Sequence, residues 1–314
     1  MFTHDLIQQQ VYERCFDNIS ERHNFHLQIG QCLGALASFD AKPAHSNSCI
    51  QTNDQIFFTG SQLTSSLIAI ACDQIDSVGP DFIADSVNDG LKQTFASWNL
   101  SAGQKASRES NSRAAQYYFS KGIALLGRGR WNDQLPLCLV LHEGAIFASF
   151  SLGEPENVAL YASAMTSNTS FDESLDIQPT VLLSLSQSGK HEEVIRRGID
   201  ILRQLHFDFP SAPTIESIMY AMANTDAISS QYSTDQLTSL CEKPVDNSVH
   251  QVVKTMDAFY GSCYASSSPY FAIVACEMIK YSLQYGISQE STIAFAVYGM
   301  LLVRKWMQIV PLMT

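Results

Sequence analysis

Apolar residues recur along most of this chain at the spacing of three and four residues that buries one face of an α-helix. In the segment 114–126, small residues lie on one side of such a helix and large apolar residues on the other. Runs that alternate apolar and polar residues between hairpin turns, which are typical of β-strands, are nearly absent. The pattern therefore predicts an all-α fold.

The same periodicity predicts where the helices lie. Ser20 is expected to cap the second helix, and a further helix is expected to restart after Gly153 and to reach Ala162. Polar residues with Pro43 predict a loop over 38–54, and a second loop is expected over 166–176. The other expected helices cover 1–16, 20–36, 55–77, 81–101, 105–126, 131–152, 178–188, 190–206, 211–224, 234–241, 249–260, 269–285 and 289–305.

Two glycines suggest a repeated helix–turn–helix unit. Gly153 and Gly189 each end one helix and precede a polar start of the next, and they are 36 residues apart. This distance is close to the period of about 34 residues of tetratricopeptide repeats. A glycine after a helix and a polar start of the next helix suit a tight turn, and small residues let paired helices approach closely. The sequence predicts an α-solenoid of tetratricopeptide-like helical hairpins.

Composition and charge narrow the class of protein. The 314 residues are 46% hydrophobic and 16% charged, as in an ordered chain. A net charge of −12 argues against nucleic acid or an anionic membrane surface as the main partner, since both attract clustered Lys and Arg. The eight cysteines include no CxxC spacing, and most of them are interpreted as buried free thiols in a reducing compartment.

Targeting signals are the next consideration. The polar start of the chain lacks the apolar core of a signal peptide, and the most apolar run, 292–313, contains Arg304 and Lys305. We therefore expect a cytoplasmic protein without membrane insertion.

Candidate chemistry is sparse, and we assign no catalytic, cofactor-binding or metal-ligating residue. No glycine lies in a phosphate-binding loop pattern. His23 and His26 would share a helix face, but a metal site needs further ligands, so a packing or capping role is expected. His4 and Asp5 are adjacent on a helix and would not face each other.

Three other features carry weaker hypotheses. His142 and Glu143 interrupt an apolar helix, where we expect hydrogen bonding between helices or a place on a concave surface. An all-α enzyme that uses this pair in a polar helical pocket is the alternative function. The aromatic run Tyr117, Tyr118 and Phe119 should be mostly core, with one ring pointing outward. The turn with Arg128, Arg130 and Trp131 is either a solvated loop or an exposed recognition corner.

Four stretches, in consistent order and spacing, together resemble one family. It comprises very large signalling proteins in which an Orc1-like AAA/STAND-type ATPase module precedes a tetratricopeptide-like helical region. These proteins are of the hybrid Ser/Thr–histidine kinase type, often with a kinase-like domain before and GAF and histidine kinase domains after. The matching stretches are Phe2–Tyr12 with His26–Gly30, Leu100–Ala106 running into Ala114–Leu126, Trp131–Glu143 with Ala145 and the Gly153 helix, and Met278–Gly286 with Ser288, Ala294–Ala296, Tyr298 and Gly299.

The resemblance implies a division of the chain and a function. Residues 1–37 look like the helical end of the ATPase-associated module, 38–104 match poorly as a loop and linking helices, and 105–314 look like the repeat region. The similarity stops after Leu302, so we expect the repeat region to be truncated. The implied function is a non-catalytic regulatory segment that binds protein partners or neighbouring domains, without cofactors. A truncated remnant without independent function is a further alternative.

Overall fold

The structure is a computed structural model that describes residues 15–16, 18–40, 60–127, 131–210, 213–241 and 247–309. Within these ranges every regular element is a helix, which confirms the predicted all-α fold. The chain divides into two compact units, Met1–Asn168 and Thr169–Thr314. Most of the predicted helix 1–16 and of the predicted loop 38–54 lies outside the described residues. The predicted boundaries at 37 and 104 remain predictions.

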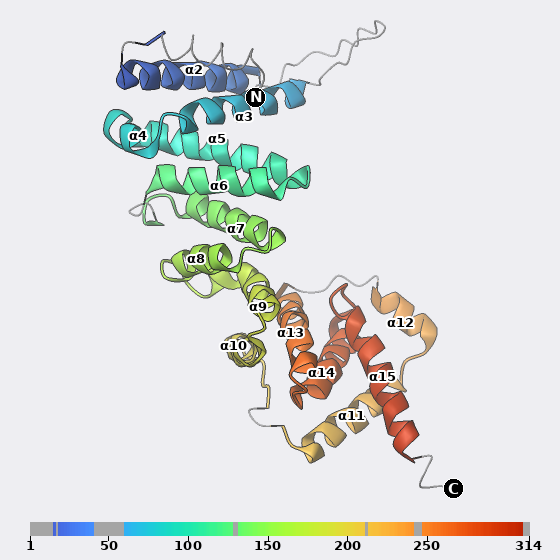
Figure 1. The fold of residues 1–314 in the computed structure, drawn as a ribbon. Helices are drawn as coiled ribbons and strands as arrows, with labels where there is room; N and C mark the ends of the chain where they lie inside the picture. The colour runs from blue at the N-terminus through green and yellow to red at the C-terminus, as the bar shows by residue number, and fades with distance from the viewer. Residues whose placement is uncertain are drawn as a thin grey trace, which may run out of the picture. The chain divides into compact units, whose positions relative to one another are not determined.

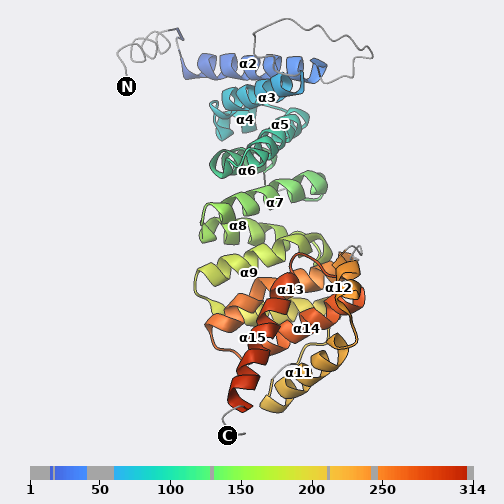
Figure 2. The same ribbon diagram turned by 90° about the vertical axis from the view of Figure 1, so that its right-hand side faces the viewer.

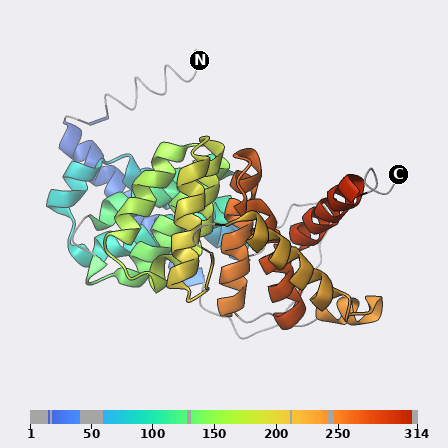
Figure 3. The same cartoon turned by 90° about the horizontal axis from the view of Figure 1, so that it is seen from below.

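Unit 1 is a row of helices that pack in chain order (Figure 1). Helix α2 packs on α3, α3 on α5, α5 on α6, α6 on α7 and α7 on α8. Seen from below, the helices of this unit overlie one another (Figure 3). The helices are α2 (Ile19–Asp40), α3 (Gly60–Asp76), α4 (Pro80–Ser86), α5 (Asp89–Arg108), α6 (Ser112–Leu126), α7 (Leu135–Ser151) and α8 (Pro155–Thr166).

Asparagine caps account for three helix starts that differ from the prediction. The expected helix 81–101 is broken before α5, where the Asn88 side chain accepts a hydrogen bond from Leu91 N at 2.9 Å. The expected helix 105–126 is broken before α6, where Asn111 accepts from Ala114 N at 3.1 Å. Asn18, and not Ser20, accepts from Glu21 N at 2.8 Å at the start of α2. An asparagine oxygen satisfies a backbone N–H at a helix start, so it favours a new helix over continuation.

Unit 2 combines two hairpins that are separated in sequence (Figure 2). The hairpin α9–α10 packs against α13, α13 packs on α14, and α11 covers α14. Phe259 and Met256 of α13 are fully buried at the centre of this core. The elements are the 3₁₀-helix η2 (Asp172–Ile177) and α9 (Gln178–Gln187), α10 (His191–Gln204), α11 (Ile215–Ser229), α12 (Thr234–Cys241), α13 (Asn247–Ala265), α14 (Tyr270–Tyr285) and α15 (Thr292–Ile309).

The turns at Gly153 and Gly189 have the same geometry. Their φ angles are 70° and 74°, in the left-handed region that glycine adopts without steric cost. In the first turn, Glu154 N donates to Ser149 O and Gly153 N to Phe150 O. The second turn repeats this pair of bonds from Lys190 N and Gly189 N. Both are Schellman motifs, which satisfy the last carbonyls of the preceding helix.

Glycines also set how closely the helices approach. The Phe119 ring of α6 lies between Gly103 of α5 and Gly144 of α7, and a Cβ atom added at either glycine would lie 2.6 Å from this ring. A Cβ atom added at Gly34 would approach the Trp98 ring even more closely, and so would one added at Gly198 of α10 to the Phe259 ring. Each aromatic ring therefore fills the space that a missing side chain leaves.

We expect Gly103→Ala to lower the free energy of unfolding of unit 1 by about 1–3 kcal/mol, because the new methyl group overlaps the enclosed Phe119 ring. Gly90→Ala in the same helix is the control, since its Cβ would meet only Asn88 Oδ1 at an ordinary 3.5 Å. Denaturant unfolding of both variants provides the measurement. Equal stabilities would show that the ring can move aside.

Candidate functional site

His142 is a packing residue in this fold. Its side chain is 6% exposed, and Nδ1 donates a hydrogen bond to Cys138 O, one turn back, at 2.8 Å. The imidazole lies against the Trp131 ring at 4.6 Å and near the Tyr161 ring at 6.3 Å. Burial lowers the pKa of His142 and keeps the ring neutral. The expected hydrogen bond between helices is thus a bond within α7, and the adjacent Glu143 is only half-buried.

The other sequence candidates are distributed over structural contacts. His26 Nδ1 donates to Gln74 Oε1 at 2.7 Å, and His23 meets the Phe82 ring edge-on at 5.1 Å. The Trp131 ring packs on His142, so it contributes to the packing of unit 1 and does not form an exposed recognition corner. The described residues contain no group of three or more His, Cys, Asp or Glu side chains with metal-site geometry. His4, Asp5, Arg128 and Arg130 lie outside the described residues.

A polar cluster between α3 and α6 was missed by the sequence reasoning. Of the aromatic run, Phe119 is buried and Tyr117 is 43% exposed, so one ring points outward as expected. The Tyr118 hydroxyl donates to Asp73 Oδ1 at 3.1 Å, and Lys121 Nζ lies 5.3 Å from the centre of the Tyr117 ring. Asp76 follows Asp73 by one turn, on the side of α3 that reaches Lys121. Residues about 45 positions apart therefore form one cluster.

Asp76 is the group of this cluster with unusual chemistry. Its Oδ2 atom is buried and has no hydrogen-bond partner. Burial raises the pKa of Asp76 to about 6, although the Lys121 charge and the side chains of Asn99 and Tyr117 oppose the shift. Burial raises the pKa of Tyr117 to about 12, and the negative charge of the Asp76 carboxylate contributes to this shift. The carboxyl group can therefore change its charge near neutral pH.

A cavity of about 210 Å³ lies beside Asp76. The last turns of α3, α4 and α6 meet at its wall, and none of these turns carries a basic side chain. Apolar side chains form much of the remaining wall, with Lys92 and Asp89 of α5 at the rim. The lining residues are Asp76, Gly79, Ile83, Ala84, Asp89, Lys92, Lys121, Ala124, Leu125, Leu126 and Gly127.

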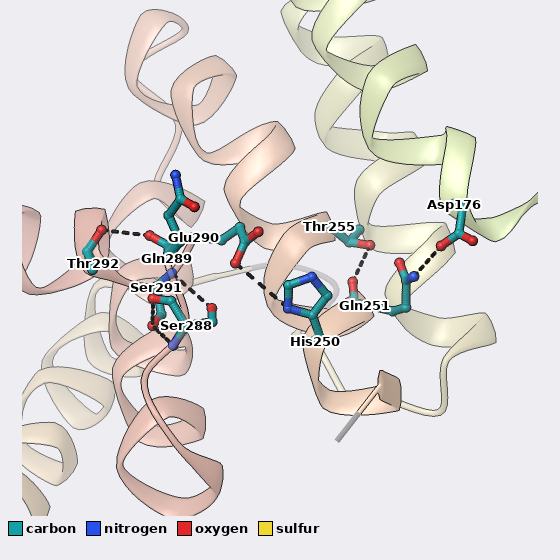
Figure 4. Close-up of polar contacts among 9 residues, drawn as sticks. All are labelled: Asp176, His250, Gln251, Thr255, Ser288, Gln289, Glu290, Ser291 and Thr292. Carbon is teal, nitrogen blue, oxygen red and sulfur yellow. Dashed lines mark hydrogen bonds and ion pairs between the residues drawn. The ribbon is translucent and has the colours of Figure 1, made fainter. Parts of the chain in front are cut away.

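Unit 2 contains a second titratable cluster, at the loop between α14 and α15 (Figure 4). Glu290 Oε2 lies 3.7 Å from His250 Nδ1 of α13. Ser288 and Ser291 exchange N–H to Oγ hydrogen bonds of 3.0 and 3.4 Å, which fix the loop around Glu290. Burial, and then the Glu290 charge, raises the pKa of Asp257 to about 6.

Close to it, Gln251 connects α13 to η2. Its Nε2 donates to Asp176 Oδ1 at 2.5 Å (Figure 4). Thr255, one turn along α13, donates its hydroxyl to Gln251 O at 2.7 Å. The bond between Gln251 and Asp176 fixes α13 against η2. Because α13 also carries His250 and Asp257, this bond helps to position the titratable cluster.

Unit 2 also has an open groove of about 460 Å³ along α10. Ile195 and Ile199 form an apolar floor, and Arg196 and Arg203 rise from the same helix. The opposite wall is the turn between α13 and α14, which includes Tyr270. The full lining is Glu192, Ile195, Arg196, Ile199, Asp200, Arg203, Ser266, Ser267, Ser268, Pro269 and Tyr270.

The groove arginines are held by weak ion pairs. Arg203 Nη1 donates to Asp200 Oδ1 at 3.0 Å, and Arg196 Nη1 lies 3.6 Å from Asp200 Oδ2. The two arginine side chains are 49% and 66% exposed. Exposed pairs of this kind contribute only about 0–1 kcal/mol. Both guanidinium groups can therefore exchange Asp200 for a carboxylate of a partner at little cost.

Comparison with known protein families, with curated proteins and with solved structures gives no match for this chain. Among the described residues, no helix is both long and apolar enough to span a bilayer.

We expect His142→Ala to lower the free energy of unfolding by about 2–4 kcal/mol, because it removes a buried ring and its hydrogen bond. Val140→Ala on the same helix, where the side chain is 38% exposed, should cost less than about 1 kcal/mol. Denaturant unfolding measures both values. A stable His142→Ala variant that has lost a hydrolase activity would instead favour the enzyme alternative.

We expect Asp257→Asn to stabilise unit 2 at pH 7 by about 1 kcal/mol. This value is reduced to allow for screening of the partly exposed carboxyl group by solvent. The raised pKa means that the fold favours the protonated carboxyl group, so this stabilisation is complete below pH 3.8 and is lost as pH rises through about 6. The gain from Asn should therefore vanish near pH 4. Hydrogen exchange of α13 amides at both pH values measures it, with exposed Asp208→Asn as control. An equal gain at pH 4 would refute the assignment.

Proposed function

We propose that this chain is a non-catalytic protein-interaction segment, built as an α-solenoid of tetratricopeptide-like hairpins, of a cytoplasmic ATPase-containing signalling protein. The observation that carries the proposal is the packing of unit 1 in chain order, in which α2, α3, α5, α6, α7 and α8 each contact the next helix of this series. Repeat arrays have this nearest-neighbour organisation, and they use their extended surfaces to bind partners.

Further support comes from the turns and from the helix contacts. Gly153 and Gly189 form equivalent Schellman turns 36 residues apart. In unit 2 the hairpins α9–α10 and α13–α14 pack on each other, with α11 and α12 between them in sequence. Such an arrangement is consistent with a repeat stack that carries an insertion. The membership in an ATPase-containing protein rests on the sequence resemblance alone.

Under this proposal, the groove along α10 binds an acidic segment of a protein partner. The floor of Ile195 and Ile199 receives an apolar side chain, and Arg196 and Arg203 bind carboxylates. Arginine suits this role because its planar guanidinium group can donate two parallel hydrogen bonds to one carboxylate. Arginine and tyrosine, which both line this groove, are also among the residues that dominate binding energy in interfaces.

An array of peptides with graded acidic and apolar content, probed with the full chain, tests this binding function. We expect acidic peptides with an apolar anchor to bind, and Arg203→Glu to weaken binding at least about tenfold, because attraction becomes repulsion. Arg197→Glu is the matched control, since Arg197 pairs with Glu193 at 2.6 Å and does not line the groove. Equal losses in both variants, or no peptide binding, would contradict the proposal.

The proposed parent protein has a separate test. Sequencing the transcript around the reading frame should reveal a phosphate-binding loop upstream and GAF or kinase coding sequence downstream. A transcript that codes for Met1–Thr314 alone would contradict the proposed parent and leave the peptide-binding function to be judged by the array.

A further inference from the structure

We propose that the unit 1 cavity beside Asp76 binds a primary alkylammonium group. This inference is independent of the groove in unit 2 and rests on three observations: an unsatisfied buried carboxylate oxygen, the helix ends around it, and the apolar wall. The cavity of about 210 Å³ is many times larger than the roughly 10–15 Å³ that one water molecule needs, so it has room for a small organic group.

The unsatisfied oxygen requires a hydrogen-bond donor. Asp76 Oδ2 is buried and accepts no hydrogen bond from the protein. A buried carboxylate oxygen without a donor is costly, so a ligand that supplies an N–H group recovers this free energy. An ammonium group supplies three donors and a positive charge.

The lysines around the cavity do not satisfy Asp76 Oδ2. Lys92 Nζ donates to Ala84 O at 2.9 Å and lies 3.9 Å from Asp89, on the rim. Lys121 Nζ lies over the Tyr117 ring, and its charge acts on Asp76 without a hydrogen bond to Oδ2. The two lysines and the two aspartates at the cavity balance each other in formal charge.

Backbone carbonyl groups add partial negative charge around the cavity, and this charge favours a cation. The C-terminal turns of α3, α4 and α6 meet at the cavity wall, and the carbonyl groups at each helix end carry a partial negative charge. Lys92 donates to Ala84 O at the end of α4, but the last turns of α3 and α6 contain no basic side chain. A bound ammonium group would therefore meet Asp76 and helix C-termini together.

The remaining wall selects an alkyl chain. Ile83, Ala124, Leu125 and Leu126 present carbon atoms next to the carboxylate. The ligand is thus a short alkyl chain that ends in –NH₃⁺, which is the chemistry of both a free amine and a lysine side chain of a partner peptide.

Titration of the full chain with n-butylamine, followed by amide chemical shifts, tests the proposal. We expect saturable shifts for the amides of 124–127 at pH 7, and no such shifts with n-butanol, which is matched in size but uncharged. Affinity should fall about tenfold between pH 7 and pH 5, because protonation removes the Asp76 charge. The other charged groups around Asp76 are Lys121, Lys92 and Asp89 in the lining, and Asp73 outside it.

Variants separate the carboxylate from the shape of the cavity. Asp76→Asn should abolish binding, whereas Asp73→Asn, one turn away on α3 and outside the lining, should preserve it. Ala84→Leu should block binding by filling the cavity without a change of charge. Should Asp76→Asn fail to fold, Ala84→Leu and the pH series still decide the matter.

A second arm identifies the source of the ammonium group. Binding of Nα-acetyl-lysine N-methylamide as well as n-butylamine would indicate a lysine side chain of a partner, and binding of n-butylamine alone would indicate a free amine. Equal binding of n-butanol, unchanged affinity in Asp76→Asn, or shifts caused by inorganic phosphate through Lys92 and Lys121 would overturn the proposal.

Discussion

The contact between a glycine and an aromatic ring sets the distance between helices in both units. Phe119 fills the space beside Gly103 and Gly144, and Phe259 fills the space beside Gly198. Protein interiors are packed to the density of organic crystals, so a ring enclosed in this way fixes the separation and the register of its neighbours. The positions of α5, α6 and α7, and with them the cluster around Asp76, depend on this spacing.

Close helix packing leaves a few carboxyl groups in poorly solvated places. Asp76 in unit 1 and Asp257 in unit 2 both have a pKa raised to about 6, with burial as the main cause. In each case a charged side chain from another segment, Lys121 or Glu290, modifies the shift. With a pKa of about 6, both groups are mostly ionised at pH 7 and become protonated as the pH falls below about 6.

Sequence patterns predicted the helices and the glycine turns because both depend on residues that are close in the chain. Helix α12, at Thr234–Cys241, has the predicted bounds, and Gly153 and Gly189 lie where the turns are. The sequence reasoning treated Asn88 and Asn111 as helix interior because apolar periodicity continues across them, whereas their side chains cap new helices. The Asp76 cluster and the α10 groove join residues far apart in sequence, which no local pattern reveals.

The packing of α9 and α10 against α13 has a consequence for synthesis on the ribosome. Most contacts of unit 1 join helices that are close in sequence, so most of its helices can dock soon after they leave the exit tunnel. Helix α10 ends at Gln204, but its partner Phe259 is made more than fifty residues later. The part of the apolar face of α10 that packs on Phe259 therefore remains uncovered during that interval, and transiently exposed apolar surface of this kind favours aggregation of a nascent chain.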